Sequence, residues 1–326
     1  MLEAGRIIGI GSAYVEGKIE SDNLHLPLEK DQLPAFLDTH PEADLYAGGS
    51  IPNILTSCAR VSGNPNIRLL SCVGNDRRGR FYIEHMDPHL GEPFISRRKP
   101  TDIWVGIYNN RLVEGMDFYG AISDLEVPKE ELHSYRNDLL ITDIDTCRIP
   151  EASYQLGRVL ATIEDHGLFI LSLTGANPNE DIDQLLSFAD KTPHLVFGNS
   201  SELSYITSQR DLEEAVKTAS PNTKLLVTTQ AEKGAVIRFN GQLFSVPARY
   251  VPEENVIDET GAGDVYMGTM LAFLLRKDFR DWNESDVMSA AKIASLASAL
   301  VIQTMHSRLT TEMAQLTLEY AQNLNL

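Results

Sequence analysis

A turn of small residues between carboxylates lies at residues 258–264, which read Asp-Glu-Thr-Gly-Ala-Gly-Asp. Apolar residues follow it at helical spacing, which predicts a helix that begins near Gly263. The first N–H groups of a helix have no partner inside it, and the helix dipole is positive at that end. The turn can therefore hold the charge of a transferring phosphoryl group, and Asp264 can accept a proton from a hydroxyl. A structural role is the alternative, because Asp also caps helices.

Two other phosphate-binding motifs do not match the sequence. A Walker A loop requires Lys after its last glycine, but Thr269 follows Gly268. A dinucleotide fingerprint requires a third glycine after Gly9 and Gly11, and Tyr14 stands at that position. The turn at residues 258–264 is therefore the strongest phosphate-binding signal in the sequence.

Short apolar segments alternate with longer amphipathic segments along most of the chain. This alternation predicts an α/β fold, with a doubly wound, mainly parallel sheet and helices on both of its faces. The expected strands are residues 6–10, 68–73, 139–143, 168–173, 195–198, 225–229 and 235–238. The expected helices include residues 154–166, 181–188 and 211–219.

One segment departs from this alternation. Residues 103–108 and 111–118 read as two strands of a hairpin, because Asn109 and Asn110 between them tolerate the left-handed backbone of a tight turn. With part of residues 14–45, the hairpin is expected to form a small β-sheet apart from the main one. Such a sheet can be a lid over a site or a decoration of the domain edge. Its aromatic side chains can stack on a base or fill the core of the small sheet; they are Trp104, Tyr108, Phe118 and Tyr119.

The composition is that of a globular protein with an acidic surface. The 326 residues include 28 Lys and Arg against 46 Asp and Glu, which gives a formal net charge of −18. Such a charge disfavours nucleic acids and anionic membranes as partners. Three widely spaced cysteines and the absence of a recognisable signal peptide favour a cytoplasmic location with reduced thiols.

Residues 258–264 resemble the signature of the ribokinase (PfkB) family of small-molecule kinases. In that family the last Asp is the catalytic base, which corresponds to Asp264, and the preceding small residues form an anion hole, which corresponds to Gly261, Ala262 and Gly263. Five motifs occur in the family's order, and the resemblance extends from about residue 6 to about residue 305. It implies one ribokinase-like α/β domain over residues 1–326, with a lid sub-domain from about 14–45 and 95–120.

The acceptor-binding residues implied by the resemblance lie near the N-terminus. Residues 47–53, Ala-Gly-Gly-Ser-Ile-Pro-Asn, resemble the family's Gly-Gly substrate motif, which assigns the acceptor to Gly48, Gly49 and Asn53. Paired glycines would let a sugar ring approach the backbone, and Asn53 offers a donor and an acceptor to hydroxyls. The first strand of the family usually ends on an Asp that binds hydroxyls, and Glu16 stands there in this chain.

The nucleotide-binding residues implied by the resemblance lie in the second half of the chain. Asn199 and Glu202 match the family's Asn-x-x-Glu motif, in which the Glu organises Mg²⁺ through water. Thr229 and Gly234 match its nucleotide loop, although Ala231 replaces a glycine. Residues 73–79, Val-Gly-Asn-Asp-Arg-Arg-Gly, resemble a further strand-end turn, for which a structural role is expected. The resemblance also permits a monovalent cation such as K⁺ at Asp258.

The resemblance thus implies an ATP- and Mg²⁺-dependent kinase that phosphorylates a hydroxyl of a small acceptor. An uncharged sugar or sugar-like acceptor is favoured, because residues 9–55 contain only Lys18 and Lys30 as cations for an acceptor phosphate. A nucleoside such as adenosine is the alternative, since residues 295–303 are similar to the adenosine-kinase-like branch. A nucleotide- or sugar-binding regulator without catalysis is a third reading, and a homodimer formed through the lid is compatible with the family.

Overall fold

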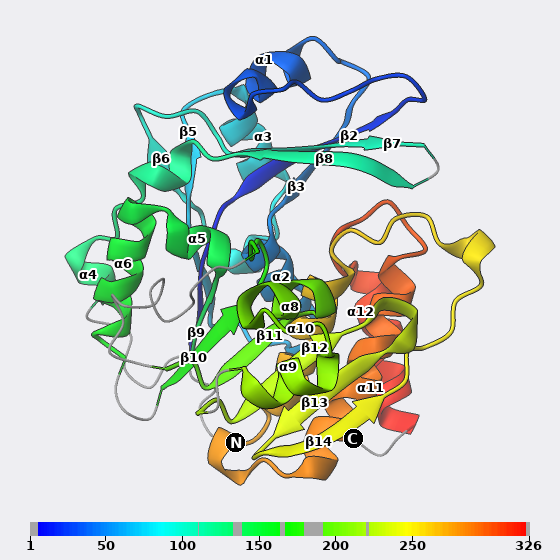
Figure 1. Cartoon of the computed structure of the whole chain (residues 1–326). Coiled ribbons are helices and arrows are strands. Elements are labelled where there is room, and N and C mark those ends of the chain that lie inside the picture. Colours follow the sequence, from blue (N-terminus) through cyan, green and yellow to red (C-terminus); the bar gives the residue numbers. More distant parts are fainter. Residues whose placement is uncertain are drawn as a thin grey trace.

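The buried strands of the chain assemble into one eight-stranded sheet, in a computed structural model that describes residues 6–109, 111–132, 139–163, 167–178, 192–219 and 222–323 (Figure 1). Its strand order is β14-β13-β12-β11-β10-β9-β1-β4. The strands are β1 (Ile7–Ile10), β4 (Ile67–Leu70), β9 (Leu139–Asp143), β10 (Leu168–Ser172), β11 (Leu195–Asn199), β12 (Leu225–Thr229), β13 (Ala235–Phe239) and β14 (Gln242–Val246). Neighbouring strands pair in parallel from β4 through β1, β9, β10 and β11 to β12, and β13 and β14 add to this edge in antiparallel pairing. The predicted α/β fold is therefore confirmed.

Helices cover both faces of this sheet, so successive strand residues enter two different cores (Figure 1). In β1, Ile7 belongs to one core, whereas Ile8 and Ile10 belong to the other. Burial on both faces explains why the strands read as continuous apolar runs. The first face carries α2 (Ser50–Ser62), α10 (Ala262–Leu274), α11 (Glu284–Val301) and α12 (Thr311–Asn323). The second carries α5 (Ile144–Arg148), α6 (Pro150–Leu160), α8 (Ser200–Thr207) and α9 (Leu212–Thr218).

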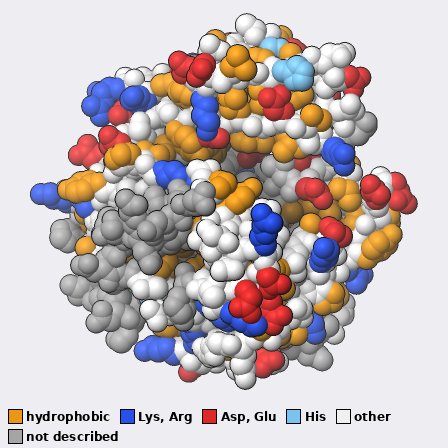
Figure 2. Space-filling model, in the orientation of Figure 1, with side chains coloured by type: hydrophobic (Ala, Val, Ile, Leu, Met, Phe, Trp, Pro, Cys, Tyr) orange, Lys and Arg blue, Asp and Glu red, His pale blue; other side chains and the backbone are white. Residues whose placement is uncertain are grey.

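A four-stranded sheet stands apart from the main sheet, as expected from the hairpin (Figure 1). Its order is β3-β2-β7-β8, with β2 (Tyr14–Glu20), β3 (Asp44–Gly48), β7 (Ile103–Tyr108) and β8 (Leu112–Phe118). One face packs on α1 (Leu33–Asp38) and forms a core of its own with Ile19, Leu37 and Val105. The other face carries Glu16, Lys18 and Tyr108. In the space-filling view a recess separates the small sheet from the main body (Figure 2).

The structure corrects some of the predicted element boundaries. The strand expected at residues 68–73 is two strands, because the chain leaves the main sheet after β4 and pairs again through β5 (Cys72–Gly74) with β6 (Phe94–Ser96). The helix expected from residue 154 begins earlier, at Pro150, whose fixed φ suits a first helical turn. The helix expected at residues 181–188 lies outside the described residues. Two further short helices of the described residues are α3 (Arg77–His85) and α4 (Lys129–Leu132).

The three cysteines, Cys58, Cys72 and Cys147, are buried, on α2, β5 and α5 respectively. Burial raises the pKa of both the Cys58 and the Cys72 thiol to about 12. Among the residues that the structure describes, no helix combines the length and the apolar character that a membrane span requires.

Candidate active site

Asp264 lies where the N-terminal ends of two helices meet. Helices α2 and α10 pack so closely that a Cβ atom on Gly268 would lie 2.3 Å from the carbonyl oxygen of Ile54. Ser50, the first residue of α2, donates a hydrogen bond of 2.7 Å from Oγ to Oδ1 of Asp264. Nδ2 of Asn53 lies 3.4 Å from the other carboxylate oxygen. Two glycine-rich segments more than 200 residues apart in sequence are thereby joined around one carboxylate.

The environment of Asp264 disfavours its charge. Burial raises the pKa of its carboxyl group well above the usual value, and the nearby carboxylates of Glu16 and Asp143 raise it further. The hydrogen bonds from Ser50 and Asn53 act in the opposite direction. A carboxylate whose pKa is moved toward neutrality is a better proton acceptor than an ordinary Asp, as a general base requires.

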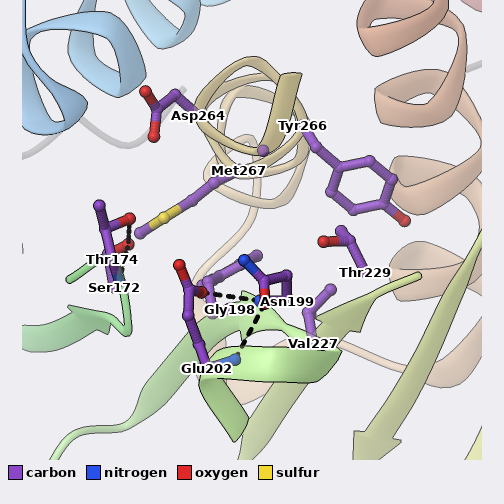
Figure 3. A pocket seen from close by; sticks show the side chains of 12 residues that line it. Ser172, Thr174, Gly198, Asn199, Glu202, Val227, Thr229, Asp264, Tyr266 and Met267 are labelled. Carbon is purple, nitrogen blue, oxygen red and sulfur yellow. Dashed lines mark hydrogen bonds between the residues drawn. The ribbon is translucent and has the colours of Figure 1, made fainter. Parts of the chain in front are cut away.

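A pocket extends from Asp264 to the carboxyl ends of β10, β11 and β12 (Figure 3). Asp264 lies on one side of it, and Glu202 and Thr229 lie on the opposite side (Figure 3). In open parallel sheets ligands usually bind at this edge. The described residues that line the pocket are Ser172, Thr174, Phe197, Gly198, Asn199, Glu202, Val227, Thr229, Gly263, Asp264, Tyr266 and Met267.

The two glycines of the anion-hole turn have different roles in the structure. Gly261 has φ = 79°, and a Cβ atom there would lie 1.9 Å from the carbonyl oxygen of Ser307, so the backbone itself requires glycine. A Cβ atom on Gly263 would meet no described atom within 4 Å, and this residue is exposed and lines the pocket. The space beside Gly263, next to the first turn of α10, can therefore take a phosphoryl group.

The predicted nucleotide residues divide into two groups. Asn199 is the N-cap of α8 and forms a capping box with Glu202. Oδ1 of Asn199 accepts from the N–H of Glu202 at 2.9 Å, and Oε2 of Glu202 accepts from the N–H of Asn199 at 2.8 Å. Both residues and Thr229 line the pocket. Gly234 is not among the described residues that line the pocket. It packs against β14 instead, where an added Cβ atom would lie 2.1 Å from the carbonyl oxygen of Val246. Ala231 has φ = 47°, so it adopts the backbone region that its glycine counterpart would favour.

The paired glycines near the N-terminus pack closely against other segments of the chain. A Cβ atom on Gly48 would lie 1.8 Å from Oε1 of Glu16, and one on Gly49 would lie 2.3 Å from the carbonyl of Ser12. The space that a side chain would need at these two positions is therefore filled by the chain itself. Glu16 accepts from the N–H of Gly49 at 3.0 Å and from Oγ of Ser307 at 2.8 Å. These bonds brace the turn that positions Ser50 and Asn53.

Asp258, where the resemblance permits a monovalent cation, is paired with a side chain of the chain itself. The Nζ atom of Lys18 lies 2.5 Å from Oδ2 of Asp258, so an ammonium group of the chain already neutralises this carboxylate. Asp76, in the other predicted turn, caps α3 by accepting from the N–H of Gly79 at 2.7 Å and also accepts from the N–H of Thr101 at 2.8 Å. This turn has the structural role that was expected of it.

Three residues of the site were not singled out from the sequence. Ser50 contacts Asp264, and its hydroxyl oxygen lies 3.2 Å from that of Thr174. Thr174 belongs to the pocket wall. Lys18 was noted only as a possible phosphate ligand. Ser50 directly follows the paired glycines at the start of a helix, and this position could have indicated a role in the site. For Lys18, the signal was a charged residue two positions after Glu16 in an alternating strand.

Two buried carboxylates outside the pocket predict an unusual dependence of stability on pH. Burial raises the pKa values of Asp102 and Asp143 to about 7 each, although both carboxylates accept backbone N–H bonds. An unfolded Asp titrates near pH 4, so between about pH 4 and 7 the folded protein binds more protons than the unfolded chain. We expect the thermal midpoint to fall as the pH rises from about 5 to about 8 at constant ionic strength.

Calorimetry across this range tests the expectation, with Asp102→Asn as the matched variant. The neutral amide cannot titrate, so its midpoint should depend less steeply on pH than that of the parent. A midpoint that rises steadily from about pH 5 to about 8 in the parent would contradict the assignment of raised pKa values.

Comparison with known proteins identifies the family of the chain. Residues 120–313, more than half of its length, match the family described as pfkB family carbohydrate kinase. A cytidine kinase from Thermococcus kodakarensis is 34% identical over 79 residues, which cover 24% of this chain and only 28% of that enzyme.

Solved kinase structures share the fold of the chain. Adenosine kinase from Sinorhizobium meliloti superposes with a TM-score of 0.76 at 16% identity, over 97% of this chain and 99% of that one. Ribokinase from Thermotoga maritima superposes with a TM-score of 0.71 at 17% identity, over 96% of this chain and 99% of that one. At such identities the likeness establishes the fold, and the family follows from the sequence match. The chain belongs to the pfkB family of carbohydrate kinases.

Proposed function

We propose that the protein transfers the γ-phosphoryl group of ATP to a hydroxyl group of a small uncharged sugar or sugar-like acceptor. The observation that carries the proposal is the position of Asp264, which lies between the start of α2 and a pocket at the strand ends, in the first turn of α10. A base and an anion hole are thereby adjacent, as transfer of a phosphoryl group to a hydroxyl requires.

The acceptor is proposed to bind at the start of α2. Oδ1 of Asn53 is buried and has no hydrogen-bond partner among the residues that the structure describes, so an acceptor hydroxyl can donate to it. Asp264 would then take the proton of the reacting hydroxyl, while Ser50 holds the carboxylate in place. The free N–H groups beside Gly263 would hold the phosphoryl oxygens as their charge develops. Closure of the small sheet as a lid would exclude water from the reaction.

Magnesium would be held mainly by the nucleotide and by water. The described residues contain no group of three or more His, Cys, Asp or Glu side chains placed to bind a metal ion. Mg²⁺ in kinases usually combines one or two carboxylates with phosphates and waters, and Glu202 at the pocket wall fits that donor set. When bound, the ion would neutralise charge on the phosphates of ATP.

Replacement of Glu202 by Gln is expected to raise the Mg²⁺ concentration needed for half-maximal rate. The amide oxygen can still accept from Asn199, so the capping box and the fold should persist, while the charge facing the metal is lost. A Mg²⁺ titration at saturating acceptor measures this effect. Glu214→Gln, in the first turn of α9, is the control and should leave the titration unchanged. An unchanged Mg²⁺ dependence in Glu202→Gln would show that Glu202 serves only as a cap.

An uncharged acceptor is consistent with the pairing of the two N-terminal lysines. Lys18 pairs with Asp258, and Lys30 pairs with Asp117 at 2.8 Å. Neither ammonium group is therefore free to bind a phosphate on the acceptor, which a sugar phosphate would require.

A nucleoside acceptor is the second candidate, and two observations favour it. The cytidine kinase of Thermococcus kodakarensis shares 34% identity with part of this chain. Trp104 on β7 pairs directly with Glu16 on β2, which places the indole on the same face of the small sheet as Glu16 and Lys18. An aromatic ring in this position can stack on a base. Phe118, by contrast, packs into the small core, and Tyr119 lies 5.7 Å from Tyr14 between ring centroids.

The experiment is ADP release with a panel of free sugars and nucleosides, each measured with the parent and with Asp264→Asn. Turnover of a sugar that the variant loses supports the first candidate, and preference for a nucleoside supports the second. If ATP binds but no member of either class is phosphorylated, the protein is a ligand-binding regulator and the proposal is wrong.

The organisation around the site is also part of the proposal. We place the whole chain in one domain, with a lid from about residues 14–45 and 95–120, because the small sheet has its own core. Strand β8 ends the sheet order and exposes Leu112 and Val113 by 42% and 65%, which fits a homodimer through the lid. Three buried and widely spaced cysteines fit a cytoplasmic location.

A further inference from the structure

A buried ion pair joins the small sheet to the turn that precedes α10. Nζ of Lys18 on β2 lies 2.5 Å from Oδ2 of Asp258, and each residue is 3% exposed. The same ammonium group donates to the backbone carbonyl of Met305 at 2.8 Å. Its centre lies 5.1 Å and 5.9 Å from the ring centroids of Tyr46 and Tyr108, both on strands of the small sheet. One positive charge is therefore enclosed by a carboxylate, a carbonyl and two aromatic rings.

The carboxylate in this pair controls the geometry of the anion-hole turn. Oδ1 of Asp258 accepts from the N–H of Thr260 at 2.9 Å. The phenol oxygen of Tyr108 lies 3.3 Å from Oδ2 of Asp258 and 3.2 Å from Oγ1 of Thr260. Thr260 directly precedes Gly261, whose left-handed backbone leads into the first turn of α10. The position of Asp258 is thus transmitted through one residue to the N–H groups beside Gly263.

A buried carboxylate at this position requires a counter-charge. Leaving a charged group without a partner in the interior costs several kcal/mol, so an unpaired Asp258 would take up a proton or a cation from solution. Lys18 supplies that charge from within the chain. Because the lysine lies on the small sheet and its partner lies at the site, the pair also fixes β2 against the turn.

We infer that Lys18 is a built-in cation that positions the phosphoryl-binding turn, so that turnover requires no free monovalent cation. The inference rests on the proposed kinase function. Lys18 is a positioning residue, because its side-chain contacts in the described structure are with Asp258, Met305 and the two tyrosine rings, and it acts on the turn through Asp258 and Thr260. Its effect should therefore appear in kcat and leave the KM for the acceptor nearly unchanged.

The test removes the lysine and supplies the cation from solution. ADP release is measured for the parent and for Lys18→Gly in tetramethylammonium chloride, and again after partial replacement by potassium or methylammonium chloride at constant ionic strength. The parent should change by less than about twofold, since its cation is covalently attached. Lys18→Gly should lose about tenfold or more in kcat and regain at least about threefold of it with methylammonium or potassium. A purely structural role would not produce rescue by a small cation.

The matched control is Lys277→Gly. Lys277 also pairs with an Asp at 2.5 Å, through Asp286, but its side chain is 54% exposed and lies on the surface. This variant should keep the parent rate in every salt. Strong activation of the parent by potassium would overturn the inference, because it would show a cation site elsewhere. A folded Lys18→Gly variant with the parent kcat would overturn it as well.

A measurement without turnover separates this inference from the proposed function. The thermal midpoint of Lys18→Gly should rise with methylammonium, while that of the parent should not, because a ligand that binds only the folded state stabilises it. If no acceptor is phosphorylated but this shift occurs, the kinase proposal fails and the cation role of Lys18 stands. If the folded variant shows neither the shift nor kinetic rescue, the cation role is wrong.

A second variant covers the case in which Lys18→Gly does not fold. Lys18→Met with Asp258→Asn removes both charges together and leaves no unpaired ion in the interior. It should fold, turn over about tenfold or more slowly than the parent, and not respond to cations. Turnover at the parent rate in this double variant would show that the ion pair only fills space.

Discussion

Asp264→Asn is expected to lower kcat by about 10²–10⁴-fold while ATP binding stays nearly unchanged. The amide cannot accept the proton of the attacking hydroxyl, but it has the size of the carboxylate and can still accept from Ser50. Oδ1 of Asn53 has no partner among the described residues and can accept from the new amide group after rotation. The measurement is single-turnover kinetics together with calorimetric titration of an ATP analogue. Retention of kcat within about tenfold of the parent would remove Asp264 from the role of base.

The same variant should be more stable than the parent near neutral pH. Burial raises the pKa of Asp264 in the folded state, so ionisation of this group favours the unfolded chain as the pH rises through that value. A neutral amide removes this cost, and the thermal midpoint should therefore increase. Asp286→Asn is the matched control, because Asp286 also lies in the first turn of a long helix, but its carboxylate accepts from the N–H of Asn283 at the surface. That control should keep full activity and gain no stability.

Gly263→Val and Gly261→Val should both abolish turnover, for different reasons. A side chain on Gly263 meets no described atom within 4 Å, so the variant should fold normally and fill the space in which the phosphoryl group is proposed to bind. A loss of about 10²-fold or more in kcat is expected, with a thermal midpoint close to that of the parent. Gly261→Val forces a branched residue into φ = 79° and against the carbonyl of Ser307, so it should lower the midpoint.

Thermal unfolding and nucleotide binding of the two variants distinguish these reasons. Gly263→Val should lose affinity for ATP without loss of stability, and Gly261→Val should lose stability first. A Gly263→Val variant that folds and turns over at the parent rate would place the anion hole elsewhere in the molecule.

The main sheet and the centre of the site could be predicted because their signals are local. Strands covered on both faces read as continuous apolar runs. A glycine-rich turn before a helix indicates an anion site, and the whole signal lies within seven residues of sequence. The motif around Asp264 therefore identified the start of α10, which begins at Ala262. The separate small sheet also followed, from the hairpin at β7 and β8.

The contacts between distant segments could not be predicted in the same way. Strand β2 alternates polar and apolar residues, a pattern typical of a strand with one face in solvent. Its polar face instead lies over the site, where Glu16 and Lys18 are 5% and 3% exposed. Nothing local to Lys18 indicates a partner 240 residues later. Nothing local to Gly48 indicates its neighbour either, because the side chain that occupies the space beside it comes from Glu16 on another strand.

The buried cysteines of the native protein should not react with thiol reagents. With pKa values of about 12, the thiols of Cys58 and Cys72 carry only about 10⁻⁵ of the reactive thiolate form at neutral pH, and the protein also shields them sterically. Each thiol becomes reactive only when its own part of the chain opens. For Cys58 this requires α2 to separate from its neighbours, and for Cys72 it requires the short strand β5 to open. The rate of alkylation at each of these two cysteines would thus report the opening of its own region, through a residue that the chain already contains.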